Sequence, residues 1–353
     1  MKYLQMRLVG ETAAVVVLAS ALSSCANAGS PLTAAPAGGI GPKSPASSMF
    51  SADVDQPNRP LIGGIAKGSA VPEGVWGAGL APRQLLFVTN LDGSIRLYPA
   101  DIHNSHAKLV GTITKGATRT EGDWIDSKGT LYVENGAQYP AQASVEEYKH
   151  GATSPFRTIT EGLNLPGAVA VGKDGTVYVN QLGQGGGGTI GVVIVYPPGG
   201  ITPERTIPLN PTPEYGMDAG GMAMDAEGNV YAATFGNANE VHVFKIAPGS
   251  SPATDLGVQG YGGSAIAVDG AGNLYTAGFN GFIAVYAPGA ILPSRTIPAD
   301  FSVYGMIAKP NGTLYAVADR FVAEYAPGTD TPINYVDTLY GETFSYDAAI
   351  GSL

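Results

Sequence analysis

The sequence is poor in the residues that most often build covalent cross-links and transition-metal sites. Its 353 residues include one cysteine and four histidines, and Asp, Glu, Lys and Arg together make up only 14%. A single cysteine cannot form an internal disulfide, so a disulfide-stapled domain is excluded. Four scattered histidines argue against a His-rich transition-metal site. A hydrophobic core and backbone hydrogen bonds must therefore hold the chain together.

Long hydrophobic runs are also missing. The apolar stretch TAAVVVLASAL at 12–22 is too short to span a bilayer. It follows the positive charges of Lys2 and Arg7 and precedes small residues, which is typical of an export signal. After residue 30 there is no long apolar pattern with a period of 3.6 residues, so the sequence predicts an all-β protein.

The end of the export signal has two interpretations. Residues 22–25, Leu-Ser-Ser-Cys, resemble the lipobox of bacterial lipoproteins, whereas 26–28, Ala-Asn-Ala, fit an ordinary A-x-A cleavage site. The lipobox is favoured because lipidation gives a purpose to the lone Cys25. The lipobox resemblance then implies a signal peptide at 1–24 and, with Ala26 in the next position, the outer membrane. Cleavage after Ala28 would instead give a periplasmic or secreted product.

A tether is predicted between this anchor and the folded domain. Residues 25–58 are rich in Ala, Gly, Ser and Pro, and such a segment cannot bury enough apolar surface to become ordered. The folded domain is predicted at 59–353. The formal net charge of −10 at pH 7 disfavours nucleic acid and anionic lipid as partners. We expect a monomer that meets the membrane only through its lipid.

One motif recurs six times in the folded domain. It is a G-x-L-Y step or a close variant, with its aromatic residue at Phe87, Tyr132, Tyr178, Tyr231, Tyr275 and Tyr315. Each copy adds further short apolar runs, which gives four predicted strands, a to d, in about 45 residues, the signature of a propeller blade. A β-solenoid would need a repeat of about 20 to 25 residues. The sequence therefore predicts a six-bladed β-propeller of four-stranded antiparallel blades.

The two ends of the domain predict how the ring closes. The first copy has no clean inner strand, because VWGAGLAPRQ at 75–84 lacks the pattern, while the tail FSYDAAIGS at 344–352 reads as an inner strand with nothing after it. The C-terminal strand should therefore complete the first blade. Closure lets six copies bury a core that one copy could not bury.

A family resemblance rests on the steps at 224–231 and 268–275, MDAEGNVY and VDGAGNLY. They resemble the NHL-type six-bladed propellers, a superfamily that also holds gluconolactonase-like and regucalcin-like lactonases and streptogramin lyases. The resemblance covers about 80–352, and the whole pattern looks most like bacterial envelope NHL-repeat lipoproteins of no established activity. It implies the fold, and it leaves both binding modules and enzymes open.

The loops are expected to divide between two faces. The a–b and c–d connections are short and form what we name the turn face. The b–c and d–a connections vary in length and form the loop face, where binding usually occurs. Candidate ligand-binding residues on the loop face are Tyr215, Asp218, Tyr261, Tyr304 and Asp319. The leading hypothesis is a non-catalytic module that binds an envelope protein or glycan; solvated polar loops are the simpler interpretation of each residue.

One carboxylate interrupts the inner strands. Asp123 aligns with apolar residues in the other copies, namely Val169, Met222, Ile266 and Met306. Glu121 lies two residues earlier and should point the same way. With Asn180 these groups could hold Ca²⁺ or Mg²⁺ through oxygen ligands, as the lactonases of the resembled superfamily do. The alternative function is therefore a metal-dependent lactonase-like hydrolase, and a hydrated channel residue is the simpler interpretation of Asp123.

Other motif matches lack the required context. The glycines at 183–188 fit a dinucleotide pattern but precede a strand, so no helix N-terminus is available for a pyrophosphate. No histidine is placed on the loop face, which disfavours a Ser-His or streptogramin-lyase mechanism. Asp225 and Asp269 resemble calcium-loop residues but are more simply explained as side chains that stabilise turns. No catalytic residue is predicted.

Overall fold

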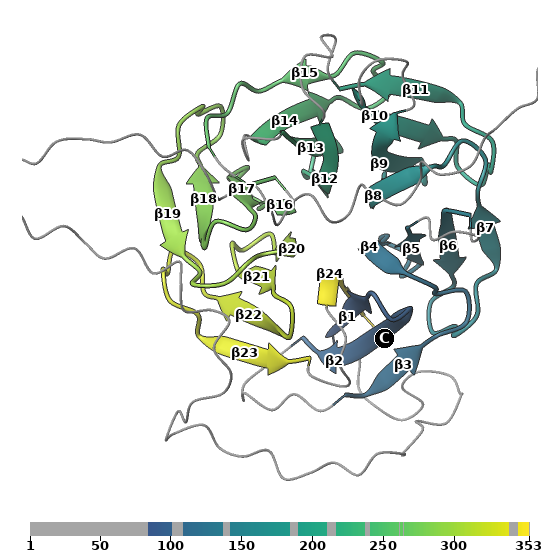
Figure 1. The fold of residues 1–353 in the computed structure, drawn as a ribbon, viewed down its shortest axis with the longest axis horizontal. Helices are drawn as coiled ribbons and strands as arrows, with labels where there is room; N and C mark the ends of the chain where they lie inside the picture. The colour runs from purple at the N-terminus through teal and green to yellow at the C-terminus, as the bar shows by residue number, and fades with distance from the viewer. Residues whose placement is uncertain are drawn as a thin grey trace, which may run out of the picture. The chain divides into compact units, whose positions relative to one another are not determined.

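The chain forms a ring of six four-stranded antiparallel sheets (Figure 1). A computed structural model describes residues 84–100, 109–136, 142–183, 190–209, 217–236, 241–260, 262–263, 265–338 and 345–352. The predicted all-β, six-bladed propeller is confirmed. The predicted signal peptide and tether, with Cys25, lie outside the described residues. No helix in the described ranges is long and apolar enough to cross a membrane.

Blades one to three each run from strand a at the centre of the ring to strand d at the rim. Blade one is β24 (Ser345–Ser352), β1 (Gln84–Asn90), β2 (Ser94–Pro99) and β3 (Gly111–Ile113). Blade two is β4 (Thr120–Ile125), β5 (Leu131–Asn135), β6 (Ser144–Tyr148) and β7 (Arg157–Ile159). Blade three is β8 (Leu165–Val171), β9 (Val177–Gly183), β10 (Ile190–Tyr196) and β11 (Arg205–Pro208).

The last three blades follow the same order. Blade four is β12 (Met217–Met224), β13 (Val230–Gly236), β14 (Val241–Ile246) and β15 (Thr254–Asp255). Blade five is β16 (Ala265–Val268), β17 (Leu274–Ala277), β18 (Phe282–Tyr286) and β19 (Arg295–Pro298). Blade six is β20 (Gly305–Ala308), β21 (Leu314–Val317), β22 (Phe321–Tyr325) and β23 (Asn334–Asp337).

The C-terminal strand closes the ring, as the sequence predicted. β24 pairs antiparallel with β1, from Gln84 opposite Ser352 to Thr89 opposite Asp347. The side chain of Thr89 also accepts a hydrogen bond from the Asp347 amide at 3.1 Å. This pairing joins the two ends of the domain and covers a strand edge that would otherwise invite aggregation.

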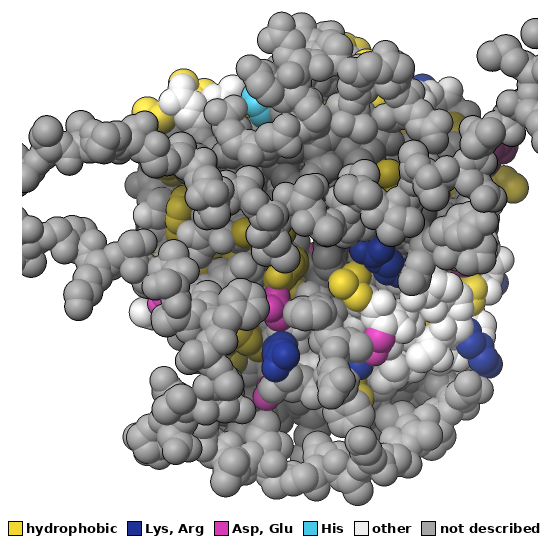
Figure 2. Space-filling model, viewed as in Figure 1, with side chains coloured by type: hydrophobic (Ala, Val, Ile, Leu, Met, Phe, Trp, Pro, Cys, Tyr) yellow, Lys and Arg dark blue, Asp and Glu magenta, His cyan; other side chains and the backbone are white. Residues whose placement is uncertain are grey.

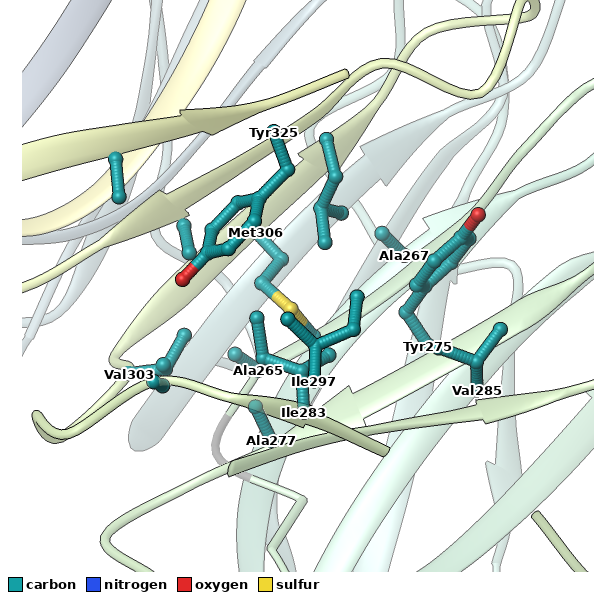
Figure 3. Close-up of a cluster of buried hydrophobic side chains, with 14 residues drawn as sticks. Ala265, Ala267, Tyr275, Ala277, Ile283, Val285, Ile297, Val303, Met306 and Tyr325 are labelled. Carbon is teal, nitrogen blue, oxygen red and sulfur yellow. The ribbon is translucent and has the colours of Figure 1, made fainter. Parts of the chain in front are cut away.

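The core lies between neighbouring blades. One cluster combines strands of blades five and six, and Figure 3 shows Met306 of blade six extending toward Ala265 and Ile297 of blade five. The other clusters likewise combine residues of adjacent blades. A single blade has no partner for these faces, so stability comes from stacking blades around the ring.

The a–b turns satisfy their own carboxylates. Asp225 accepts hydrogen bonds from the Asn229 amide at 2.8 Å and from the Tyr231 hydroxyl at 3.0 Å. Asp269 makes the same contacts with Asn273 and Tyr275. Both aspartates stabilise turns, as the sequence suggested.

Candidate functional site

The inner strands surround an axial channel on which two carboxylates lie. The channel has a volume of about 180 Å³ and is lined mainly by apolar side chains such as Met222, Ile266 and Met306. Asp123 of β4 and Asp347 of β24 are the carboxylates in its wall. Asp347 was missed at the sequence level, although the tail was assigned to an inner strand. In the register of β24 with β1, Ala348 occupies the Asp123 column and Asp347 lies one residue before it, so comparing this column alone would not have shown the second acid.

Asp123 and Asp347 influence each other's ionisation. Asp123 is 5% exposed, and neither of its carboxylate oxygens has a hydrogen-bond partner. Burial raises the pKa of Asp123 well above its ordinary value, and the charge of Asp347 raises it further. The nearby Ala349 amide partly offsets both, although it forms no well-directed hydrogen bond with the carboxylate. Burial also raises the pKa of Asp347 to about 7. Hydrogen bonds from the backbone amides of Ala348 and Asp123 favour the charged form and oppose this rise only in part. Two such groups titrate as a pair, which favours retention of a proton near neutral pH.

Glu134 of β5 is a third buried acid that sequence reasoning missed. It is fully buried, and both carboxylate oxygens lack a partner. Burial raises its pKa well above the ordinary value, and the charges of Glu121 and Asp347 add to this effect while Arg119 opposes it. Its carboxyl is therefore electrostatically linked to both neighbours.

An alignment of the second strands contains the sequence pattern that could have identified Glu134. The position two residues after the repeated aromatic is polar in blades one to three and apolar in blades four to six: Thr89, Glu134, Asn180, Ala233, Ala277 and Val317. All six are fully buried or nearly so. The polar half of this column marks the part of the ring that departs from a plain hydrophobic core.

Glu121 is paired with a cation and occupies a bulge. Its Oε1 lies 2.6 Å from Nε of Arg119. The register of β4 shifts between Thr120 and Gly122, and this irregularity interrupts the alternation from which we expected Glu121 and Asp123 to point the same way. The electrostatic partners differ as well, because Glu121 acts on Glu134 while Asp123 interacts with Asp347.

Asn180 joins two blades. Its Nδ2 donates to the carbonyl oxygens of Gly220 at 2.9 Å and Ala233 at 2.8 Å, both in blade four, while its buried Oδ1 has no partner. None of these contacts brings Asn180 to Glu121 or Asp123. Within the described ranges, no group of three or more His, Cys, Asp or Glu residues could hold a metal ion. The predicted Glu121, Asp123 and Asn180 cation site stays a prediction.

The described part of the loop face carries an exposed aromatic pair. The rings of Phe279 and Tyr304 meet edge to face, with centroids 5.5 Å apart, and Phe279 is 55% exposed. Asn280 beside them has no hydrogen-bond partner for either polar side-chain atom, and Asp319 has none for Oδ1. Sequence reasoning named Tyr304 and Asp319 but missed Phe279 and Asn280, although both occupy the b–c turn of blade five.

Backbone hydrogen bonds hold these turns together. The Val303 amide donates to the Gly278 carbonyl, and the Tyr304 amide donates to the Val317 carbonyl, each at 2.9 Å. Among the other candidates, Tyr215 and Tyr261 lie outside the described residues, and the side chain of Asp218 in β12 is also outside them. Figure 2 shows acidic and basic side chains in small groups near the middle of one face, without a large field of one sign among the coloured side chains in view.

Comparison with known proteins supports the architecture. No protein-family model matches the chain, and no curated protein sequence matches it. A crystal structure of a protein of unknown function from Bacteroides caccae is similar, with a TM-score of 0.56 and 12% identity over 76% of this chain and 99% of that chain. At this identity the likeness shows the fold alone. The chain has β-propeller architecture, and its NHL-type resemblance stays a prediction.

Proposed function

We propose that this chain is a non-catalytic binding module that captures an envelope protein or glycan through its loop face. One observation carries the proposal. The buried carboxyl and amide atoms that have no hydrogen-bond partner in the described part of the chain all lie on inner strands, late in second strands or in the turns after them. Those on the loop-face side belong to Glu134, Asn180, Asn280 and Asp319, whereas Asp123 lies in the half of β4 nearer the a–b turn.

Such groups are costly to keep. A buried acceptor or donor without a partner costs about 1–3 kcal/mol, so a structure that retains several of them near one face is suited to a ligand that supplies the partners. The carboxylates of the turn face show the contrast, because Asp225 and Asp269 are already satisfied within their own turns. The loop face therefore supports ligand recognition better than the turn-face aspartates do.

The aromatic pair adds an apolar contact to these polar groups. Phe279 and Tyr304 present ring edges and faces beside Asn280. Aromatic surface combined with a few amide and carboxyl groups is typical of binding sites. A protein side chain or the CH face of a sugar ring would contact the rings, while its amide or hydroxyl groups would meet Asn280 and Asp319.

We also propose where this module works. Lipidation at Cys25 would anchor it, and the segment 25–58 would hold the propeller away from the bilayer. The predicted location is the outer membrane, with a periplasmic or secreted product as the alternative. We expect a monomer that binds its partner through the loop face. Its net negative charge disfavours nucleic acid as that partner.

Site-specific photo-crosslinking in intact cells would test the proposal. A photoreactive phenylalanine analogue at position 279 should capture a ligand. The same analogue at Phe156, which is 49% exposed and directly precedes β7, is the matched control. In parallel, the purified chain and its Phe279→Ala, Asp319→Asn variant would be compared on an array of bacterial envelope glycans. Equal crosslinking at both positions, together with unchanged array binding by the variant, would contradict a loop-face binding role.

A second candidate is the metal-dependent hydrolase. It is favoured by the orphan oxygens of Asp123 and Glu134, because hard cations prefer such carboxylate ligands. A bound cation would supply Lewis-acid chemistry, and Asp123 and Asp347 would be the groups to hold it in the channel. Calorimetric titration with Ca²⁺ and Mg²⁺ separates this candidate from the binding module, which needs no cation.

A further inference from the structure

Blades three and four enclose a cleft on the turn face, opposite the proposed binding face. Its volume is about 480 Å³, which falls within the size range of small-molecule sites. Blade three contributes Gly172, Lys173, Tyr178 and Arg205, and blade four contributes Pro248 and Gly249. The cleft exists because this part of the ring departs from the repeat in three places.

The first departure is a missing turn aspartate. In blades two, four and five an aspartate begins the a–b turn and bonds the repeated tyrosine: Asp126 with Tyr132, Asp225 with Tyr231, and Asp269 with Tyr275. Blade three has Gly172 at this position. Tyr178 therefore lacks the turn carboxylate that its counterparts contact.

The other departures remove acids that pair with the arginine of the outer strand. In blade two, Arg157 forms a bidentate pair with Glu147. In blade five, Arg295 reaches Asp330 of the next blade at 3.1 Å. The equivalent acids are replaced around Arg205 by Val195 and Ser251.

Arg205 is consequently the least well paired with acids of the three, although its guanidinium forms a hydrogen bond with the Tyr178 side chain. Its Nε is buried without a hydrogen-bond partner, and its nearest acid, Glu204, lies 4.0 Å away and is 55% exposed. Arg157 reaches the c–d turn of the next blade, where a Cβ at Gly199 would lie 3.3 Å from its Nη1, whereas a Cβ at the equivalent Gly249 would meet nothing within 4 Å. The space that a bridging side chain fills between blades two and three is open here.

We propose that this cleft binds the carboxylate of a ligand, which takes the place of the missing Asp. The other blades show the chemistry, since Asp225 accepts from the Tyr231 hydroxyl and lies 3.7 Å from Nζ of Lys245. Tyr178 and Arg205 already contact each other, as Tyr231 and Lys245 do in blade four. A ligand carboxylate bound beside this pair would reproduce that arrangement with the stronger, planar donor set of an arginine. Asp174, Glu204 and Glu227 around the cleft disfavour a doubly charged phosphate. The site is independent of the loop-face function.

The test compares three probes by calorimetry with the full chain. N-acetyl-alanyl-alanine carries a free carboxylate, its C-terminal amide is the matched control, and glucuronic acid tests a sugar source of the same group. The peptide acid should bind at least about tenfold more tightly than its amide, because only the acid can pair with Arg205. Binding by glucuronic acid alone would identify a sugar acid as the source, and stronger binding by inorganic phosphate than by either acid would overturn the proposal.

Variants make the test specific. Arg205→Gln should abolish carboxylate binding, and Arg295→Gln in blade five should leave it unchanged. The double variant Gly172→Asp, Asp174→Ala copies the Asp269 turn of blade five; a Cβ at Gly172 would crowd only the flexible end of Asp174 at 2.7 Å, which this variant removes. It should fold with an equal or higher melting temperature and lose carboxylate binding. Binding that survives in both the Arg205→Gln and the double variant, or no binding of any acid to the wild-type chain, would overturn the proposal.

Discussion

The carboxylates of the a–b turns and those of the channel show how differently one fold treats the same group. Hydrogen bonds from Thr176 lower the pKa of Asp174. Burial opposes ionisation of Asp225, but hydrogen bonds from Asn229 and Tyr231 and the charge of Lys245 outweigh it and lower its pKa. In the channel, burial dominates and raises the pKa values of Asp123 and Asp347, and it does the same for Glu134 on the neighbouring second strand.

The difference teaches that the number of donors, and not the depth in the fold alone, decides the charge state. A turn presents several backbone amides to one carboxylate, so the charged form is stabilised locally. A channel wall made of β-strands uses most of its amides in the ladders, so Asp347 accepts from the Ala348 amide but receives fewer donors than the turn carboxylates do. The turn carboxylates therefore stabilise the fold when ionised, whereas the channel carboxylates are retained at a cost, which is the pattern expected of functional groups.

Deletion of the closing strand β24 should have the largest effect, because it removes one of the channel carboxylates together with the strand that carries it. Removal of residues 345–352 takes away both Asp347 and the strand that pairs with β1. We expect a loss above about 5 kcal/mol, because the ring opens and exposes the edge of β1. Thermal unfolding followed by circular dichroism and light scattering should show aggregation without a cooperative transition. The full-length Asp347→Asn variant, which keeps the strand, should unfold cooperatively; an unchanged melting temperature after the deletion would contradict closure by β24.

The pH dependence of stability should separate the two sets. The pKa of Asp347 is raised from 3.8 to about 7, so its contribution to stability is complete below pH 3.8 and is lost as the pH rises to about 7. We therefore expect Asp347→Asn to stabilise the protein at pH 8 relative to wild type by about 1–3 kcal/mol and to match it more closely at pH 5. Urea unfolding at both values would measure this, and a variant that is less stable than wild type at pH 8 would count against a raised pKa.

The sequence predicted the ring well because its signals are local and repeated. Each copy carries its own tyrosine and glycine turn, and even closure by residues 344–352 could be predicted from one strand missing at the start and one extra at the end. The repeat supplies six independent examples of one pattern, so an error in one copy is corrected by the others.

The site was harder to predict because it depends on register and on contacts between blades. Asp123 stood out in its column, but the bulge at Glu121 shifts the register of β4, and no local pattern announced it. Asp347 lies more than 200 residues from Asp123 along the chain, so their interaction appears only once the ring is closed. The role of Asn180 as a donor to Gly220 and Ala233 likewise follows from blade packing.

The contribution of a turn aspartate to stability should change with pH in the direction opposite to that of Asp347. The pKa of Asp225 is lowered, so its contribution is present above its ordinary value of 3.8 and disappears as the pH falls through the lower folded value. We expect Asp225→Ala to lose about 1–2 kcal/mol at pH 7, because the Asn229 amide and the Tyr231 hydroxyl lose their acceptor. The loss should shrink toward pH 3. Chemical denaturation across this range would check it, with Glu227→Ala, an exposed residue of the same turn, as the control.

Cation binding is expected to have the smallest effect among these tests of the difference between the turn and channel carboxylates. If the channel carboxylates are retained for a cation, Ca²⁺ or Mg²⁺ should add roughly 1 kcal/mol of stability when its concentration is about five times the dissociation constant. Asp123→Asn should abolish the calorimetric signal because both carboxylate oxygens of this channel residue lack a partner. Glu121→Gln should change it less, since Arg119 already pairs with Glu121 at 2.6 Å. Equal losses in the two variants would support the cation site that the sequence predicts, in which Glu121 and Asp123 are both ligands. If neither cation gives heat and chelator does not change the melting temperature, Asp123 and Asp347 are a proton-sharing pair in a channel without metal.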